Sequence, residues 1–428
     1  MTRSYIVTIE KLVLGGQGLG RTTSGQVIFV WGALPGETVE VTIIKKKKNY
    51  LEGIVKEIIT ASPDRIAPVE DHYLVCSPWQ IISPKTETDW KLKMAEENYE
   101  RLARIHYSGL EITSDADNFY HYRNKIEYSF ALNEKNQLSF GFSERGGWDK
   151  VAISGCILAS PAITEVAEHI LNWLRQTTLS VTTLKSLVLR SNSRGEVAAA
   201  LFVNQKVTFT NTPKLNERLL GFQIYFTDHR CPASRPDELL FSDGQNYLTE
   251  KINDIELKFG LLSFFQINPP LFEQALRDIE PWLDNNPSVI DYFSGVGAVS
   301  LTLHHKIKEA KLIEVNREAV DYAAENIKFN KLANFSAILS PAEKAVDYIT
   351  SDQTIIFDPP RAGLGPTIIR KIQEAQPPRI IYLSCDPATH ARDIMSLSPL
   401  YEVKFLKLYN FFPRTPHIES LAILELKK

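Results

Sequence analysis

The chain lacks any apolar run long enough to cross a membrane. It has 428 residues, and no stretch approaches the ~18 consecutive apolar residues that a spanning helix needs. The N-terminus alternates like a strand and lacks the apolar block of a signal peptide. Cysteine is also scarce, and the four residues are too widely spaced for a disulfide framework: Cys76, Cys156, Cys231 and Cys385. These absences favour a cytoplasmic protein.

A strong excess of either charge is missing as well. The net charge is −3 and the pI is about 6.3, which argues against a generic nucleic-acid coat. The charge is uneven, however, because residues 1–60 hold eight Lys/Arg against five Asp/Glu. Four of these lysines are consecutive, from Lys45 to Lys48. This run is either a solvated hairpin tip or a patch that contacts phosphates.

Short alternating strands fill the first 60 residues. The segments that read as strands are 5–9, 26–30, 38–43 and 51–58. No strand–helix–strand unit surrounds the glycine run Gly15–Gly20, so we interpret it as a turn and not as a dinucleotide loop. The pattern predicts a five-stranded, OB-like β-barrel, a common oligonucleotide binder.

The rest of the chain divides into two regions after a linker at 62–68. Residues 85–106 predict a helix, and 120–260 are mostly strands with one helix at 162–176. From about 260 onward strands and helices alternate, which predicts a doubly wound, largely parallel sheet of the α/β class. Its strands centre on 288–290, 310–313, 354–357, 379–382 and 420–424, with helices at 316–330 and 366–376. We therefore expect three domains: 1–62, 63–259 and 260–428.

A glycine-rich loop ends the first strand of this predicted sheet. It runs from Asp291 to Gly297 and includes Phe293 and Gly295. Glycines at this place let the backbone turn tightly and approach a ligand. Glu314 ends the next strand, where an acid suits a ribose diol. The pair would serve NAD or S-adenosylmethionine, and the lack of a third glycine favours a cofactor without pyrophosphate.

Two further strand ends carry reactive groups. Asp358-Pro359-Pro360-Arg361 follows one strand, and the two prolines hold its carboxylate rigidly at the carboxyl edge of the sheet. Amine methyltransferases usually have an aromatic residue after such a Pro-Pro pair, where this chain has Arg361. Cys385 follows the next strand, in a poor place for core packing, although a free cysteine is more often inert than nucleophilic.

A thiol beside a methyl donor has a specific use on uracil. Uracil C5 is too weak a nucleophile to attack a methylsulfonium, but addition of a thiolate to C6 turns C5 into an enolate-like carbon. A base must then remove the C5 proton before the thiolate leaves. The C-terminal third supplies a thiol in Cys385 and a candidate base within Phe412–Glu419.

At this point the chain closely resembles the RNA uracil-C5 methyltransferases that carry an N-terminal TRAM domain. The resemblance covers essentially the full length, and several of its motifs are long and occur in the family's order. They are the TRAM-like barrel, Arg123–Lys125, Phe264–Pro269, Asp291–Gly297, Asp358–Arg361, Ser384–Thr389 and Phe412–Glu419. The resemblance implies a TRAM barrel at 1–62, a central RNA-binding domain and a Rossmann-like methyltransferase domain from 260.

The resemblance also implies roles for single residues. Cys385 would be the nucleophile and Glu419 the base that takes the C5 proton. S-adenosylmethionine would be the cofactor, and its site, with that of the flipped target base, would be lined by Gln266, Phe293, Gly295, Gly297, Glu314 and Asp358. For His417 we favour a structural role. RNA would be the partner, ribosomal RNA rather than the T-loop of transfer RNA, and we expect a monomer.

The chain departs from the family in two respects. Many relatives hold a [4Fe–4S] cluster with four cysteines, three of them before the helix that begins near residue 85. Here that region offers Cys76 alone, and Cys156 matches the distant fourth ligand. Two thiols do not replace four, so we expect no cluster. Asp386 follows the expected nucleophile where Asn is usual, and its carboxylate would disfavour a thiolate.

Two other classes of function remain open on the sequence. A Rossmann methyltransferase that acts on amines or small molecules would leave Cys385 dispensable. A non-catalytic RNA-binding protein would use the barrel and the basic strand Tyr122–Tyr128, with a vestigial pocket. The target uridine is not fixed by the sequence, because relatives that act on ribosomal and on transfer RNA share the same catalytic residues.

Overall fold

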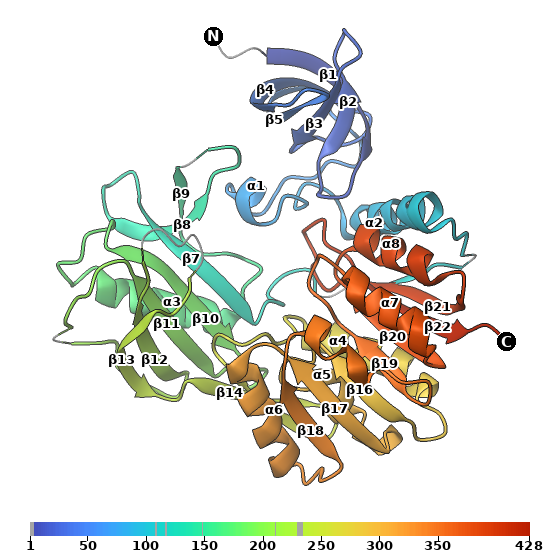
Figure 1. The fold of residues 1–428 in the computed structure, drawn as a ribbon. Coiled ribbons are helices and arrows are strands. Elements are labelled where there is room, and N and C mark those ends of the chain that lie inside the picture. Colours follow the sequence, from blue (N-terminus) through green and yellow to red (C-terminus); the bar gives the residue numbers. More distant parts are fainter. Residues whose placement is uncertain (1–3, 108, 116–117, 148, 210, 229–233) are drawn as a thin grey trace.

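The chain folds around three sheets and one hairpin in the computed structural model (Figure 1). The structure describes residues 4–428 except 108, 116–117, 148, 210 and 229–233. Among these residues, no helix is both long and apolar enough to span a membrane.

The N-terminal sheet is a closed barrel with strand order β1-β2-β3-β5-β4, as predicted. Its strands are β1 (Ser4–Leu12), β2 (Gly18–Arg21), β3 (Val27–Trp31), β4 (Thr38–Lys46) and β5 (Tyr50–Thr60). Alternate side chains such as Val7, Val39 and Val41 fill its interior. The interpretation of Gly15–Gly20 as a turn is wrong for its second half. Gly18–Gly20 pair within β2, where a Cβ on Gly20 would lie 2.5 Å from Val7 Cγ1.

The lysine run lies at the end of the long β4–β5 hairpin. Lys45 and Lys46 close β4, and exposed Lys47 and Lys48 form the turn into β5. Lys45 Nζ lies 3.1 Å from a carboxylate oxygen of Glu52 across the hairpin. The run therefore lies at an exposed hairpin tip, and whether it contacts phosphates stays a prediction.

The segment after the barrel packs against the far end of the chain. It holds α1 (Tyr73–Cys76), α2 (Pro84–Asn98), a π-helical turn (Tyr99–Ala103) and β6 (Ile112–Thr113). The Ser83 side chain caps α2 by accepting from the Thr86 amide. α2 lies beside α8 (Figure 1), and β6 pairs with β21 at the edge of the C-terminal sheet. The predicted 63–259 unit thus shares elements with the C-terminal sheet, and the three-domain division stays a prediction.

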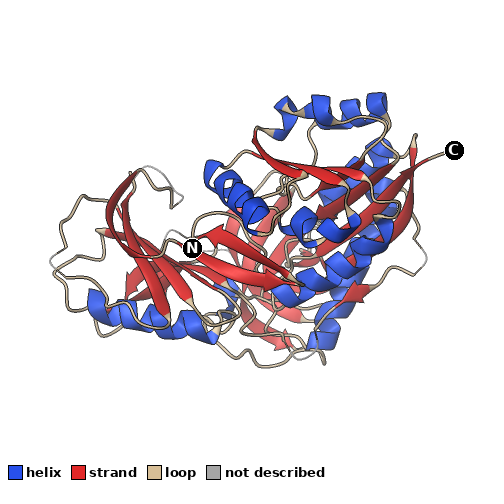
Figure 2. Cartoon of the chain, turned by 90° about the horizontal axis from the view of Figure 1, so that it is seen from below, coloured by secondary structure: helices blue, strands red, loops and turns tan. Residues whose placement is uncertain are grey.

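The central sheet has seven strands in the order β13-β12-β11-β10-β7-β8-β9. They are β7 (Lys125–Leu132), β8 (Leu138–Ser143), β9 (Lys150–Ile153), β10 (Leu184–Ser191), β11 (Val197–Val203), β12 (Leu219–Phe226) and β13 (Glu238–Gly244). Helix α3 (Pro161–Leu174) buries Ile163, Val166 and Ile170 against one face, and Figure 2 shows it along one side of these strands. A separate hairpin, β14 (Tyr247–Ile252) and β15 (Ile255–Gly260), leads into the last region.

The C-terminal sheet has the order β18-β17-β16-β19-β20-β22-β21-β6, and its first five strands are parallel, as predicted. The strands are β16 (Ser288–Tyr292), β17 (Glu309–Glu314), β18 (Phe335–Leu339), β19 (Thr354–Phe357), β20 (Arg379–Ser384), β21 (Tyr401–Tyr409) and β22 (Glu419–Leu426). The helices are α4 (Pro269–Ile279), α5 (Ala298–Thr302), α6 (Arg317–Phe329), α7 (Pro366–Ala375) and α8 (Pro387–Leu397). Short 3-10 turns lie at 280–282, 304–306, 342–344 and 346–348.

Both faces of this sheet are buried, which explains its continuous apolar strands. Val289 packs into the core that includes α4 and α6, whereas its neighbour Ile290 packs into the core that includes α2, α7 and α8. Successive side chains point to opposite faces of a strand, so one strand serves both cores. The order reverses between β16 and β19, and a ligand crevice is expected at the carboxyl ends of strands beside such a switch.

Candidate active site

A cavity of about 630 Å³ lies at this edge of the C-terminal sheet. It is lined by residues that follow β16, β17, β18, β19 and β20, by Phe264 and Gln266, and by the loop that leads into β22. The cavity brings together Cys385, Glu419 and every predicted cofactor residue except Gly297. Residues that are up to 155 positions apart in the sequence, from Phe264 to Glu419, therefore line one cavity.

The glycine loop shapes one wall of the cavity. Phe293 and Gly295 both have positive φ, of 61° and 55°, and the backbone turns away from β16 through them. A Cβ on Gly295 would meet nothing closer than 3.8 Å, so the space beside it is open. Gly297 does not line the cavity. A Cβ there would lie 2.6 Å from Leu312 and 2.7 Å from Leu301, so its lack of a side chain serves the packing of α5 on β17.

Glu314 is fixed at the end of β17 by backbone amides. Its Oε1 accepts from the amides of Val315, at 2.8 Å, and Asn316, at 2.7 Å. Its Oε2 accepts from the Gly295 amide at 3.0 Å, which ties the acid to the glycine loop. The carboxylate is thus held in one orientation at the cavity wall, with lone pairs left to accept from hydroxyl groups.

Asp358 and Gln266 form a second polar pair. Gln266 Nε2 donates to Asp358 Oδ2 at 3.1 Å. Burial raises the pKa of Asp358 to about 7, and the hydrogen bond from Gln266 opposes that rise only in part. Asn124 holds Gln266 from behind, because its Nδ2 donates to the Gln266 carbonyl at 2.9 Å. The side chain of Asn124 is mostly buried and so supports the Gln266 backbone.

The register of β20 and β22 places Cys385 beside Glu419. These strands are antiparallel, and Ser384 pairs with Ser420. The residue after Ser384 and the residue before Ser420 therefore meet at the same end of the ladder. Both line the cavity. This register brings the two predicted catalytic residues, 34 positions apart in the sequence, to the same end of the ladder.

Burial and like charge disfavour ionisation of both groups. Burial raises the pKa of the Cys385 thiol to about 12, the carboxylates of Glu419 and Asp358 add to this, and Arg361 opposes it. Burial and then Asp358 raise the pKa of Glu419 well above its usual value. The Cys385 thiol is therefore protonated at neutral pH unless a cation enters the site, and ionisation of Glu419 is disfavoured.

Asp386 acts mainly as a helix cap. Its Oδ1 accepts from the amides of Ala388, at 3.0 Å, and Thr389, at 2.9 Å, at the first turn of α8. The carboxylate thus faces the positive end of the helix. It remains the last of the contributions that raise the pKa of Cys385, behind Glu419 and Asp358.

His417 and Arg361 form a pair at the cavity rim. Arg361 Nη2 lies 3.2 Å from His417 Nε2, and the His417 ring contacts Phe412 edge-on. Burial and the nearby Arg361 charge lower the pKa of His417 to about 3, so the ring is neutral. The segment Ser340–Glu343 also lines the cavity and was missed, because β18, which precedes it, was not predicted. The apolar segment Phe335–Leu339, read as a strand, could have predicted that the residues after it reach the same edge of the sheet.

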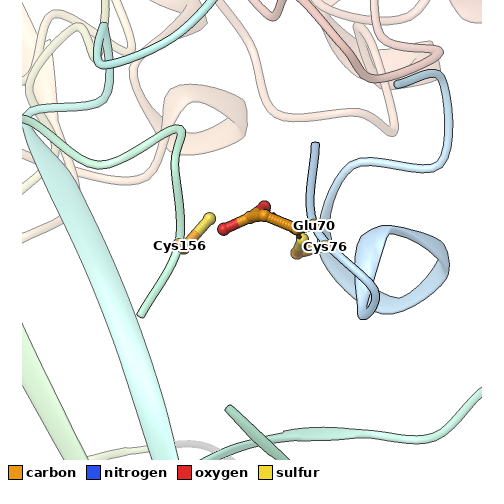
Figure 3. Close-up of side chains that lie close together, drawn as sticks. All are labelled: Glu70, Cys76 and Cys156. Atoms are coloured by element: carbon orange, nitrogen blue, oxygen red, sulfur yellow. Dashed lines mark hydrogen bonds between the residues drawn. The ribbon is translucent and has the colours of Figure 1, made fainter. Parts of the chain in front are cut away.

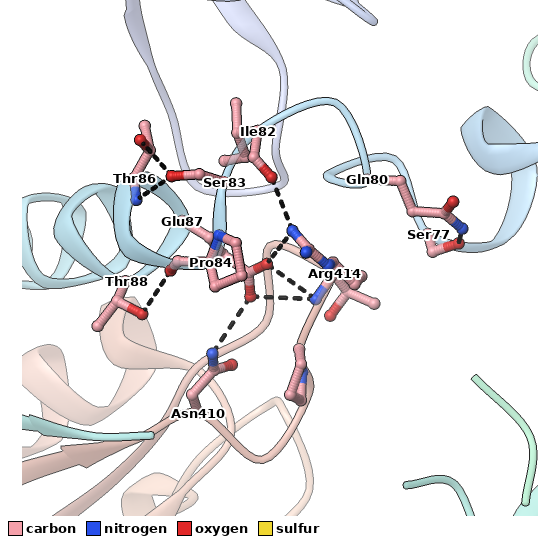
Figure 4. Close-up of polar contacts among 12 residues, drawn as sticks. Ser77, Gln80, Ile82, Ser83, Pro84, Thr86, Glu87, Thr88, Asn410 and Arg414 are labelled. Carbon is pink, nitrogen blue, oxygen red and sulfur yellow. Dashed lines mark hydrogen bonds and ion pairs between the residues drawn. The ribbon is translucent and has the colours of Figure 1, made fainter. Parts of the chain in front are cut away.

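A buried ionic network that includes Glu87, Asn410 and Arg414 (Figure 4) holds the loop that leads into β22. Glu87 of α2 lies 2.9 Å from Lys91 Nζ and accepts from the Arg414 amide at 3.0 Å. Lys91 Nζ donates to Asn410 Oδ1 at 2.6 Å and to the Phe412 carbonyl at 3.1 Å. The side chains of Glu87 and Lys91 are fully buried. The N-terminal helix therefore positions one wall of the cavity.

Removing the acid of this network should destabilise the protein. Glu87→Leu leaves Lys91 and Arg414 buried without their counter-charge, so we expect a loss of about 3–5 kcal/mol in the free energy of unfolding. The measurement is the urea midpoint of the unfolding transition. Asp89→Asn on the exposed face of the same helix is the control and should leave the midpoint unchanged. Equal midpoints for both variants would show that the network adds no stability.

Comparisons with known proteins agree with this architecture. The sequence model of the TRAM domain matches residues 3–56, and that of tRNA (Uracil-5-)-methyltransferase matches residues 347–427. An uncharacterized RNA methyltransferase of Fusobacterium nucleatum is 30% identical, over 98% of this chain and 95% of the relative. One from Enterococcus faecalis is 28% identical, over 99% and 97%.

A solved structure has the same fold from end to end. The tRNA (uracil-54, C5)-methyltransferase of Pyrococcus abyssi, in complex with S-adenosyl-L-homocysteine, superposes with a TM-score of 0.77. The match covers 98% of this chain and 100% of that one, at 21% identity, and so concerns the fold. The near full-length relative from Fusobacterium nucleatum shows that this chain belongs to the RNA methyltransferases, with matches to the sequence models of the TRAM domain and of tRNA (Uracil-5-)-methyltransferase in its N-terminal and C-terminal regions.

Proposed function

We propose that this chain transfers a methyl group from S-adenosylmethionine to C5 of a uridine in RNA, with Cys385 as nucleophile and Glu419 as base. The observation that carries the proposal is the meeting of these two side chains in one cavity with Glu314 and Asp358. The Pyrococcus abyssi enzyme of the same fold was solved with S-adenosyl-L-homocysteine, which supports the choice of cofactor.

The residues on the β16–β17 side of the cavity suit this cofactor. Glu314 is fixed by three amides and would accept hydrogen bonds from the ribose hydroxyls. The open space beside Gly295 and the ring of Phe293 would receive the rest of the nucleoside. When bound, the cofactor supplies an electrophilic methyl group and a positive charge. Asp358 and Gln266 line the same cavity as Cys385 and would form hydrogen bonds with polar groups of the cofactor or of the target uracil.

The protein residues would then act in sequence on the uracil. The Cys385 thiolate adds to C6, the π electron pair of the C5–C6 double bond moves to C5, and C5 takes the methyl group, which leaves S-adenosylhomocysteine. Glu419 removes the proton left on C5, the C5–C6 double bond re-forms and the C6–S bond breaks. A raised pKa makes Glu419 a stronger base once it is ionised.

Arg361 is proposed to help to form the thiolate. Its charge lowers the raised pKa of Cys385, so Arg361→Gln should raise that pKa further. Because the thiolate fraction grows with pH below the pKa, single-turnover rates should rise with pH, and those of the variant should be ~10-fold lower at pH 7.5 if the pKa rises by about one unit. Arg361→Lys keeps the charge and should recover part of the rate. A pH profile that is unchanged in Arg361→Gln would contradict this role.

A fluorinated substrate tests the covalent step. RNA that carries 5-fluorouridine at the target should remain attached, because Glu419 has no C5 proton to remove. We expect a protein–RNA complex that survives denaturation and whose peptide link maps to Cys385. Absence of this complex, with both substrates shown to bind, would favour direct methylation of another atom.

We favour ribosomal RNA as the substrate class because the chain carries a TRAM barrel. The T-loop of transfer RNA is the second candidate, because the sequence model that matches residues 347–427 describes tRNA enzymes. Both classes would use the same cavity.

A further inference from the structure

A second group of reactive side chains lies outside the cavity, between the segment that holds α1 and the central sheet. Cys76, Cys156 and Glu70 point toward one another (Figure 3). Their two sulfur atoms and one carboxylate oxygen all lie within 4.8 Å of each other. Glu70 and Cys76 come from the linker and α1, and Cys156 comes from the loop between β9 and α3. None of the three lines the active-site cavity.

The carboxylate of this cluster is held in place by its neighbours. Glu70 Oε1 accepts from the Ile157 amide at 2.6 Å and lies 3.4 Å from His72 Nε2. Glu70 Oε2 accepts from Gln80 Nε2 at 2.9 Å and lies 3.8 Å from Cys76 Sγ. Metal-binding carboxylates are commonly oriented by such outer hydrogen bonds.

The spacing and the donor set suit one metal ion. A tetrahedral Zn²⁺, with Zn–S of ~2.3 Å and Zn–O of about 2.1 Å, separates a sulfur and an oxygen ligand by ~3.6 Å. The 3.8 Å between Cys76 Sγ and Glu70 Oε2 is close to this value. A [4Fe–4S] cluster normally takes four thiolates, whereas the described residues supply two thiols and a carboxylate here.

We propose that Glu70, Cys76 and Cys156 bind a single Zn²⁺ ion, with a water molecule or His72 at the fourth position. His72 Nε2 is buried and lies 3.4 Å from Glu70 Oε1, beside the carboxylate of the cluster. The ion links α1 to the central sheet across a sequence separation of 80 residues between the two thiols. Both thiols lose their protons on binding, so affinity for the ion rises with pH.

Cobalt titration of the metal-stripped, full-length protein tests this site. One equivalent of Co²⁺ should give thiolate-to-cobalt charge transfer in the near ultraviolet and the intense visible bands of a tetrahedral ion, and Zn²⁺ should displace it. Cys76→Ser and Cys156→Ser should lose these bands, and Cys385→Ser should keep them. Zn²⁺ should also raise the unfolding temperature by roughly 2–4 °C.

A milder variant keeps the test valid if a cysteine variant fails to fold. Glu70→Gln preserves the shape and the bond from the Ile157 amide, and should weaken Co²⁺ binding at least tenfold. Three results would overturn the proposal: Co²⁺ binding that is unchanged in Glu70→Gln and Cys156→Ser, a stable iron–sulfur cluster after anaerobic reconstitution that needs both thiols, or a Cys76–Cys156 disulfide that forms in place of metal binding.

Discussion

Replacing Cys385 by alanine should lower methyl transfer to RNA at least ~10⁴-fold while cofactor binding is retained. The reason is that uracil C5 becomes nucleophilic only after a sulfur adds to C6, and no other described thiol lines the cavity. The loss should appear in kcat and not in substrate binding, because the bond between the Cys385 sulfur and uracil C6 forms only during the reaction. Single-turnover kinetics and calorimetric titration with S-adenosylmethionine measure the two quantities separately.

Cys385→Ser serves as the matched variant for this test. Its hydroxyl fills nearly the same space, so the fold and the cofactor site should be intact, but an alcohol with a much higher pKa does not replace a thiolate. Both variants should therefore be equally inactive. Methyl transfer that survives in Cys385→Ala would support the rival class, a methyltransferase that acts on amines, in which the thiol is dispensable.

Glu419→Gln should stop the reaction after methylation and not before it. Without the base, the C5 proton stays in place and the C6–S bond does not break, so the methylated RNA should remain attached to Cys385. Turnover should fall by ~10²–10⁴-fold, the usual contribution of a positioned acid or base. Denaturing gels with labelled RNA should show a covalent complex that the unaltered enzyme shows only transiently.

The fold should tolerate this substitution. Burial and Asp358 raise the pKa of Glu419 well above its ordinary value, so the site disfavours a charge there and a neutral side chain of the same shape should fit it. The unfolding temperature of Glu419→Gln should therefore equal or exceed that of the unaltered protein. Rapid release of methylated RNA by the variant would assign the base to another residue.

Much of the active site could be read from the sequence because its residues follow strand ends. Phe293, Glu314, Asp358 and Cys385 each end or follow a strand in the parallel part of one sheet, and such ends gather at one edge whatever the loops do. Glu419 was reached through the family resemblance, and its place beside Cys385 follows from a strand register that no local pattern encodes.

The long-range contacts had no sequence signal. Lys91 and Asn410 are 319 residues apart, and each reads locally as an ordinary polar residue. The two-residue strand β6 is too short for periodicity to reveal, yet it attaches the segment after the barrel to the C-terminal sheet. Gly297 was assigned to the cofactor by its place in a glycine run, whereas the side chains of Leu301 and Leu312 surround it.

The most direct test of the central claim is methyl transfer from labelled S-adenosylmethionine to unmodified ribosomal and transfer RNA, followed by digestion to nucleosides. We expect label in 5-methyluridine, from ribosomal RNA if that favoured class is the substrate and from transfer RNA if the second candidate is. Label in another nucleoside, or none in either RNA although the cofactor binds, would contradict uridine C5 methylation by this chain.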